Sequence, residues 1–194
     1  MNRATLLLAR HGETDWNRDG RWQGATDIPL NEVGRVQARA LADRLRKRRI
    51  VGVASSDLSR AIETADIVAA SLGVARIGAF HALRERSYGA FEGLTRDECK
   101  LRFADVFAGS VPGALLDPPG AERKVDVGAR VAGGLTSLVS AHDASDGALV
   151  VVAHGGAIRM FLEAAFDAHV GPLANGATFV ITLEHKRFVA FEEL

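Results

Sequence analysis

Cysteine and long apolar runs are both scarce in this sequence. A single cysteine, Cys99, excludes a disulfide framework and a zinc site built from cysteines. The longest apolar runs, residues 5–9 and 148–153, are far too short to cross a bilayer. The apolar stretch near the first residue is shorter than the core of a secretory signal, and no small-residue cleavage site follows it. These absences predict a cytoplasmic protein without a membrane partner.

Net charge is absent as well, because 24 basic residues balance 24 acidic ones. A balanced chain lacks the broad positive surface that binds nucleic acid, so any recognition of an anion is expected to be local. Lysine is rare: four of the basic residues are Lys and 20 are Arg. Genome composition accounts for most of these arginines, but at a few positions a guanidinium group suits a bidentate grip on phosphate or carboxylate.

The chain is long enough for one domain, which we expect to span residues 1–194 with a small lid or insertion at about 80–121. Apolar strands alternate with amphipathic helices. The expected strands are residues 4–9, 50–54, 74–80, 149–153, 178–183 and 188–191, the last two joined as a hairpin across 185–186. The expected helices are residues 31–48, 95–103, 122–142 and 157–166, with another that starts from a cap within 55–59 and ends at Gly73. Residues 10–24, 83–93 and 108–121 are expected to be loops. This alternation predicts an α/β fold, a three-layer α/β/α sandwich with a mostly parallel central sheet and helices on both faces.

Two of the predicted strands end in the same dipeptide, His-Gly. His11 follows the first strand and His154 follows the strand at 149–153, and the glycine after each permits close approach of a ligand to the backbone. Ligands of parallel sheets bind outside the carboxyl ends of the strands, so both imidazoles are expected in one pocket. A zinc site is the rival interpretation, but it needs a third ligand, and the sequence has no H-x-x-x-H or C-x-x-C spacing.

Arginines beside these histidines favour an anion over a cation. Arg10 directly precedes His11, and Arg60 lies in the first turn of the helix after the second strand. A helix start offers free N–H groups and the positive end of the dipole. Arg60 alone would be interpreted as a solvated surface residue. At the same sheet edge as two histidines it is a candidate phosphate clamp.

Five segments, in this order, carry a resemblance to a known family. They are R-H-G-E-T at 10–14 with Asn17, W-Q-G at 22–24, S-S-D-L-S-R-A at 55–61, L-R-E at 83–85 with G-A-F-E-G at 89–93, and A-H-G-G at 153–156. Together they resemble the histidine phosphatase superfamily, which includes the cofactor-dependent phosphoglycerate mutases. The resemblance covers nearly the whole chain and implies a phosphoglycerate mutase-like fold.

The resemblance also implies roles for single residues. His11 would be the nucleophile that forms a phosphohistidine, and neighbouring arginines would keep its imidazole neutral. Glu85 would protonate the leaving alkoxide and then activate water; without the resemblance it is interpreted as an exposed carboxylate between Arg84 and Arg86. The phosphoryl group would be held by Arg10, Arg60, Asn17, His154 and the Gly155 N–H, and the substrate also by Gln23, Gly24, Arg86, Tyr88 and Arg96. No metal and no cofactor is implied, because arginines supply the charge.

Two reactions of this family remain in competition. Tyr88 and Arg96 resemble the mutase pattern. The lack of a long insertion, of paired arginines in 101–121 and of a C-terminal tail favours a phosphatase, as does Gly156 where mutases usually have Asn. We therefore expect a metal-independent histidine acid-type phosphatase acting on a small phosphorylated metabolite, with a phosphoglycerate mutase as the alternative. A non-catalytic binder of phosphorylated ligands is less favoured, since every decisive residue is present. A homodimer is a family-level expectation.

Overall fold

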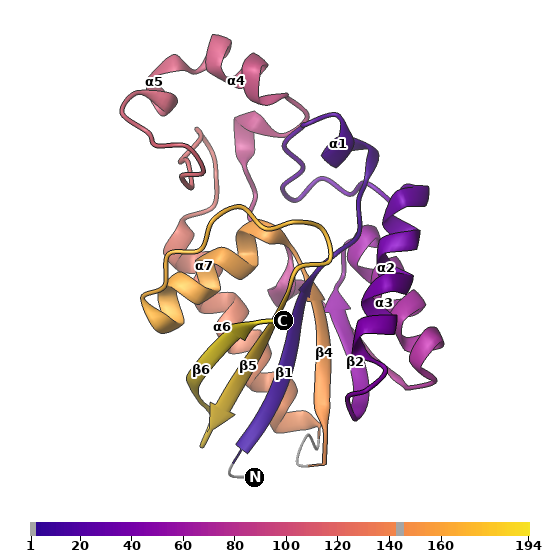
Figure 1. The fold of residues 1–194 in the computed structure, drawn as a ribbon. Helices are drawn as coiled ribbons and strands as arrows, with labels where there is room; N and C mark the ends of the chain where they lie inside the picture. Colours follow the sequence, from indigo (N-terminus) through magenta and orange to yellow (C-terminus); the bar gives the residue numbers. More distant parts are fainter. Residues whose placement is uncertain (1–2, 143–145) are drawn as a thin grey trace.

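The computed structural model describes residues 3–142 and 146–194, which contain one six-stranded sheet with the order β3-β2-β4-β1-β5-β6 (Figure 1). The strands are β1 (Arg3–Arg10), β2 (Ile50–Ser56), β3 (Arg76–Phe80), β4 (Ala148–Ala153), β5 (Thr178–Glu184) and β6 (Arg187–Glu193). Strands β1 to β4 are parallel, and β5 and β6 run antiparallel to their neighbours. The predicted mostly parallel sheet is confirmed.

Helices cover both faces of this sheet. Helices α2 (Glu32–Leu45) and α3 (Ser59–Leu72) lie on one face, and α6 (Lys124–Ala141) and α7 (Gly155–Phe166) lie on the other (Figure 1). Alternate residues of β1 serve the two layers: Leu7 packs with α2 and α3, whereas Leu6 and Leu8 pack with α6 and α7. Each such leucine is fully buried, which stabilises the fold by roughly 1.5–3 kcal/mol per side chain. The predicted three-layer sandwich is confirmed.

The connection from β3 to α6 forms a separate layer above the carboxyl ends of the strands (Figure 1). It contains two 3₁₀ turns, η1 (His81–Leu83) and η2 (Gly89–Phe91), and two short helices, α4 (Arg96–Arg102) and α5 (Ala104–Phe107). A small core of its own holds it together, in which Phe91 packs on Phe103 and Phe107 and Cys99 is buried. No helix within the described ranges is both long and apolar enough to cross a membrane.

Several local expectations need correction. The loop expected at 10–24 contains a helical turn, α1 (Asp15–Arg18), which is capped by Thr14 and Asn17, and the loop at 83–93 contains the two 3₁₀ turns. The expected side-chain cap of α3 within 55–59 is absent, because the N-cap is Leu58. Asp27 replaces it from a distant loop, accepting the Ser59 N–H at 2.8 Å.

The closing hairpin is confirmed. His185 and Lys186 have φ angles of 49° and 64°, as a two-residue turn between twisted strands requires.

Candidate active site

The two His-Gly sequences leave the sheet next to each other. Arg10 at the end of β1 is paired with Ala153 at the end of β4, so the imidazoles of His11 and His154 lie side by side. Their ring centroids are 5.1 Å apart. Gly12 serves packing here, because a Cβ on it would lie 2.4 Å from the carbonyl oxygen of Gly34 in α2. The turn after β1 is thereby pressed onto the start of that helix.

The tautomer of His11 follows from one hydrogen bond. Its Nδ1 lies 2.6 Å from the carbonyl oxygen of Gly12, which accepts only, so Nδ1 carries the proton and Nε2 keeps a free lone pair. Burial, reinforced by the positive charges of Arg60 and Arg10, holds the pKa of His11 well below 6.5. His11 is therefore neutral at pH 7 and able to act as a nucleophile.

His154 has the opposite tautomer. Its Nδ1 accepts a hydrogen bond from Nε of Arg60 at 3.2 Å, so the proton of the neutral ring sits on Nε2. Burial and then the charge of Arg60 hold the pKa of His154 well below 6.5. In the part of the chain that the structure describes, His154 Nε2 and Nε of Arg10 are the buried side-chain polar atoms without a hydrogen-bond partner. Buried donors without acceptors are rare, and these two are suited to bind oxygen atoms of a ligand.

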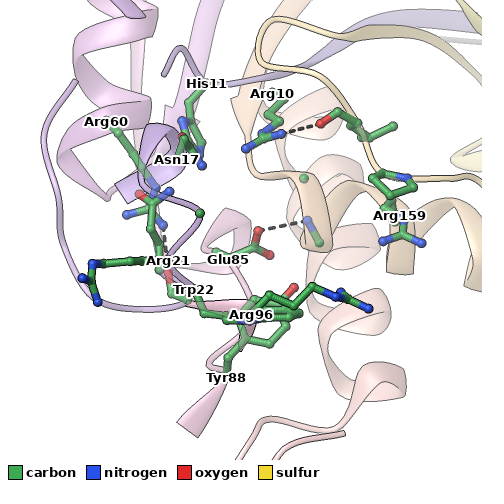
Figure 2. A pocket seen from close by; sticks show the side chains of 17 residues that line it. Arg10, His11, Asn17, Arg21, Trp22, Arg60, Glu85, Tyr88, Arg96 and Arg159 are labelled. Atoms are coloured by element: carbon green, nitrogen blue, oxygen red, sulfur yellow. Dashed lines mark hydrogen bonds between the residues drawn. The ribbon is translucent and has the colours of Figure 1, made fainter. Parts of the chain in front are cut away.

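Arg60 is fixed in place although it pairs with no carboxylate among the described residues. Its two terminal nitrogens donate to the carbonyl oxygens of Thr26 at 2.9 Å and Gly24 at 2.8 Å. Burial lowers the pKa of Arg60 to about 10, which leaves it charged at neutral pH. Arg10 is anchored in the same manner, through a hydrogen bond from Nη1 to the carbonyl oxygen of Leu173 (Figure 2). Both guanidinium groups are thus held by neutral acceptors and keep their full charge for a ligand.

The carboxylate of Glu85 is seated on the first turn of α7. It accepts the N–H groups of Gly156 at 2.9 Å and Ala157 at 2.8 Å, and the first of these bonds is drawn in Figure 2. A Cβ at position 156 would lie 2.6 Å from Oε1 of Glu85 and 2.3 Å from the hydroxyl oxygen of Tyr88. This position of the Glu85 carboxylate therefore requires glycine at residue 156.

The arginines next to Glu85 in sequence point to other partners. Arg84 pairs with Asp57 at 2.6 Å, and Arg86 pairs with Asp117 at 2.7 Å.

The side chains of Arg10, His11, Arg60 and Glu85 line one cavity of about 290 Å³. Trp22 and Tyr88 form part of its wall, with ring centroids 4.8 Å apart. Among the described residues its charged lining consists of one carboxylate, Glu85, and five arginines: Arg10, Arg21, Arg60, Arg96 and Arg159. The described ranges contain no cluster of three or more His, Cys, Asp or Glu side chains that could hold a metal ion. The cavity is thus built for an anion.

A family model described as the histidine phosphatase superfamily (branch 1) matches residues 6–191. The chain belongs to this superfamily. It is 34% identical to a metal-independent phosphoserine phosphatase of Arabidopsis thaliana over 95% of the chain and 78% of that protein. It is 32% identical to a 2,3-bisphosphoglycerate-dependent phosphoglycerate mutase of Mesorhizobium japonicum over 98% and 97%. The solved structure of a mycobacterial glucosyl-3-phosphoglycerate phosphatase with VO3 superposes with a TM-score of 0.83, at 30% identity over 98% and 97%.

Most of the residues predicted for the site of this histidine phosphatase line the cavity. They are Arg10, His11, Asn17, Gln23, Gly24, Arg60, Glu85, Tyr88, Arg96 and Gly155 (labelled in part in Figure 2). His154 is not among the lining residues, but its ring centroid lies 5.1 Å from that of His11. Asn17 uses its carbonyl oxygen for Thr14 and Asn175, which leaves its amide N–H groups for a ligand. The predicted residues thus come together, and the roles given to them are taken up below as proposals.

Arg86, which the sequence analysis predicts to bind substrate, does not line the cavity. Its side chain is 1% exposed and lies outside the cavity. Its guanidinium group donates to the carbonyl oxygens of Leu116 and Glu122, each at 2.6 Å, and pairs with Asp117. Arg86 therefore ties the segment before α6 to the loop that carries Glu85.

Arg159 and Leu173 are among the cavity residues that the sequence analysis does not predict. Arg159 lines the cavity from α7, and Leu173 closes it from the loop before β5. A signal for Arg159 was present: it is the single charge in the first eight residues of an otherwise apolar helix, directly after His-Gly-Gly. No comparable signal marks Leu173, since it acts through its backbone carbonyl group.

Proposed function

We propose that this protein is a phosphomonoester hydrolase that acts on a small phosphorylated metabolite through a phosphohistidine at His11. The observation that carries the proposal is the free lone pair of His11 Nε2 in a cavity whose buried donors lack acceptors. A neutral imidazole attacks phosphorus, the bond to the alkoxide breaks, and water then cleaves the phosphohistidine to release phosphate.

The donors around His11 would stabilise the transferring group. Arg10, Arg60 and the Nε2–H of His154 are held before substrate arrives, so little reorganisation is needed as charge develops on the phosphoryl oxygens. The same positive charges disfavour protonation of His11, so one arrangement serves both binding and nucleophile activation.

Glu85 would move the protons. In the first step its carboxyl group gives a proton to the departing alkoxide, and in the second its carboxylate takes one from the attacking water. A positioned general acid of this kind contributes roughly 10²–10⁴-fold to the rate. Its seat on α7 supports this role, because the backbone N–H groups of Gly156 and Ala157 fix where the carboxyl group lies.

Release of inorganic phosphate from a panel of phosphorylated metabolites tests the proposal. The panel should include O-phosphoserine and 3-phosphoglycerate, since proteins named as phosphatases of related compounds are similar to this chain. The wild type should release phosphate, and His11→Ala should release none. His169→Ala, which changes an exposed histidine outside the cavity, is the matched control and should keep full activity. Phosphate release by His11→Ala at the wild-type rate would contradict the proposal.

A phosphoglycerate mutase is the second candidate. The similarity to the Mesorhizobium mutase and the position of Tyr88 and Arg96 in the cavity favour it. Incubation of 3-phosphoglycerate with catalytic 2,3-bisphosphoglycerate separates the two. We expect phosphate release with little 2-phosphoglycerate, whereas fast isomerisation with little free phosphate would establish the mutase. Absence of both products would favour a binder.

A homodimer and a cytoplasmic location stay predictions. Light scattering of the purified chain tests the first, and fractionation of the source cells tests the second.

A further inference from the structure

Arg159 is a cation that the proposed reaction leaves unused. It projects from the first turns of α7 into the cavity, and in Figure 2 its guanidinium group lies across the cavity from Arg60 and Asn17. Nε donates to the carbonyl oxygen of Val170 at 2.8 Å and Nη2 to that of Gly113 at 2.7 Å. Within residues 3–142 and 146–194, Nη1 has no protein acceptor and the side chain forms no ion pair.

A buried cation without a counter-ion is costly, so its presence needs a reason. Arg159 is 9% exposed, and burial lowers its pKa. The two carbonyl groups hold the fork rigidly but neutralise none of its charge. A guanidinium group that is fixed, unpaired and open to a cavity is suited to a bidentate or charge-assisted bond with an anion.

The charge of the whole cavity leads to the same conclusion. Of its five arginines, Arg21 pairs with Glu98 at 3.4 Å, and the other four form no ion pair in the described part of the chain. A phosphate dianion carries two negative charges, and Glu85 adds a third when it is ionised, against those four positive ones. At least one positive charge remains, and Arg159 and Arg96 are the arginines outside the group around His11.

Arg96 is the other arginine that lines the cavity outside the group around His11. It lies on α4 of the connecting segment, with its guanidinium group 5.5 Å from the ring centroid of Phe107, and it is exposed. An anion between Arg96 and Arg159 would therefore link the connecting segment to α7. Because Arg159 is buried and Arg96 is exposed, Arg159 is expected to contribute more of the affinity.

We propose that Arg159 forms a subsite for a second anionic group of the substrate, so that the enzyme prefers phosphomonoesters that also carry a carboxylate or another phosphate. The inference rests on the proposed hydrolysis and adds to it the class of substrate. It makes Arg159 a specificity-determining residue with no part in the bond-breaking steps.

Matched substrate pairs test the subsite. 3-Phosphoglycerate and glycerol 3-phosphate differ by a carboxylate in place of a hydroxymethyl group, and fructose 1,6-bisphosphate and fructose 6-phosphate differ by a second phosphate. A charge-assisted bond predicts that kcat/KM of the wild type is about 10–100-fold higher for the more anionic member of at least one pair. The pair that shows the preference identifies the anion.

Variants assign that preference to Arg159. Arg159→Met should remove most of the preference by lowering kcat/KM for the anionic substrate while leaving the other within about twofold, and Arg159→Lys should restore part of it. Arg102→Met, which changes an exposed arginine of α4 outside the cavity, should leave the preference unchanged. A merely structural role, through Val170 and Gly113, would instead lower both members of a pair equally.

Binding to His11→Ala, measured by calorimetry with the same four esters, separates this inference from the proposed hydrolysis. A preference for the anionic esters that disappears with Arg159→Met in this background supports the subsite even if no ester is hydrolysed. Ratios near one in both pairs, or equal losses for both members in Arg159→Met, would overturn it.

Discussion

Replacing Gly156 with alanine adds one methyl group at a crowded point of the active site. That carbon would lie 2.6 Å from Oε1 of Glu85 and 2.3 Å from the hydroxyl oxygen of Tyr88, and no contact this short persists in a folded protein. Tyr88 is held by Trp22, whose ring centroid is 4.8 Å away, so we expect the carboxyl group of Glu85 to be the part that moves.

The size of the effect follows from what Glu85 would lose. The two hydrogen bonds between its carboxyl group and α7 would break. The carboxyl group would then move out of reach of the substrate oxygen that it protonates. Since a positioned general acid contributes roughly 10²–10⁴-fold, we expect Gly156→Ala to lower the rate on alkyl phosphates by on the order of 10²-fold. p-Nitrophenyl phosphate should lose far less in the first turnover, because p-nitrophenolate leaves without a proton.

Single-turnover phosphate transfer from both kinds of substrate is the assay. In a Glu85→Gln background, Gly156→Ala should have little further effect, because both substitutions remove the same contribution. Gly133→Ala is the matched control: it places a methyl group in open space on α6, where it should leave the rate unchanged and stabilise the helix by roughly 0.5–1 kcal/mol. A Gly156→Ala enzyme that keeps its rate on alkyl phosphates within about twofold would refute the reasoning.

Four further predictions follow from the site. The pKa of His11 and of His154 is held below 6.5 by burial first and Arg60 second, so the unfolded chain takes up protons below about pH 6.5 that the folded chain does not. Urea unfolding should therefore show constant stability above pH 6.5 and a loss below it of at most about 1.4 kcal/mol per pH unit for each histidine; a flat profile from pH 7.5 to 5.5 would contradict this. Arg60→Met should raise the pKa of His11 in an NMR titration without fully restoring 6.5, because burial remains, and should lower kcat/KM by on the order of 10²-fold. Arg86→Met should destabilise the fold by about 2–5 kcal/mol in urea while the folded enzyme keeps its KM, and a raised KM without loss of stability would restore Arg86 as a substrate contact. EDTA should leave activity intact, and activity that is lost in EDTA and returns with an added metal ion would revive the zinc interpretation.

The sheet and the centre of the site could be predicted from the sequence because both depend on strand pairing. The runs at β1 and β4 are apolar on both faces, which is typical of parallel strands inside a sandwich. Parallel strands end at one edge, so the sequence predicts that His11 and His154 lie together. The resemblance to a family then placed Glu85, which no periodicity marks.

The features that the sequence did not predict depend on the direction of side chains in irregular segments. Arg84, Glu85 and Arg86 are consecutive, yet one pairs with Asp57, one sits on α7 and one is buried against Leu116. In a strand or a helix, the periodicity predicts the direction of each side chain. Residues 84–86 lie in neither, so the sequence does not predict these directions. The prediction of the α3 cap was wrong for a related reason. Asp27 accepts the Ser59 N–H from 32 residues away in the sequence, so no local pattern reveals this cap.

Trapping the covalent intermediate tests the central claim most directly. The enzyme is mixed with substrate for less than one turnover, denatured in alkali, which preserves phosphohistidine, and digested for mass spectrometry. We predict one phosphoryl group on Nε2 of His11, absent from the His11→Ala variant and unchanged in His169→Ala. Turnover without any phosphorylated histidine, or a label on another residue, would contradict the account.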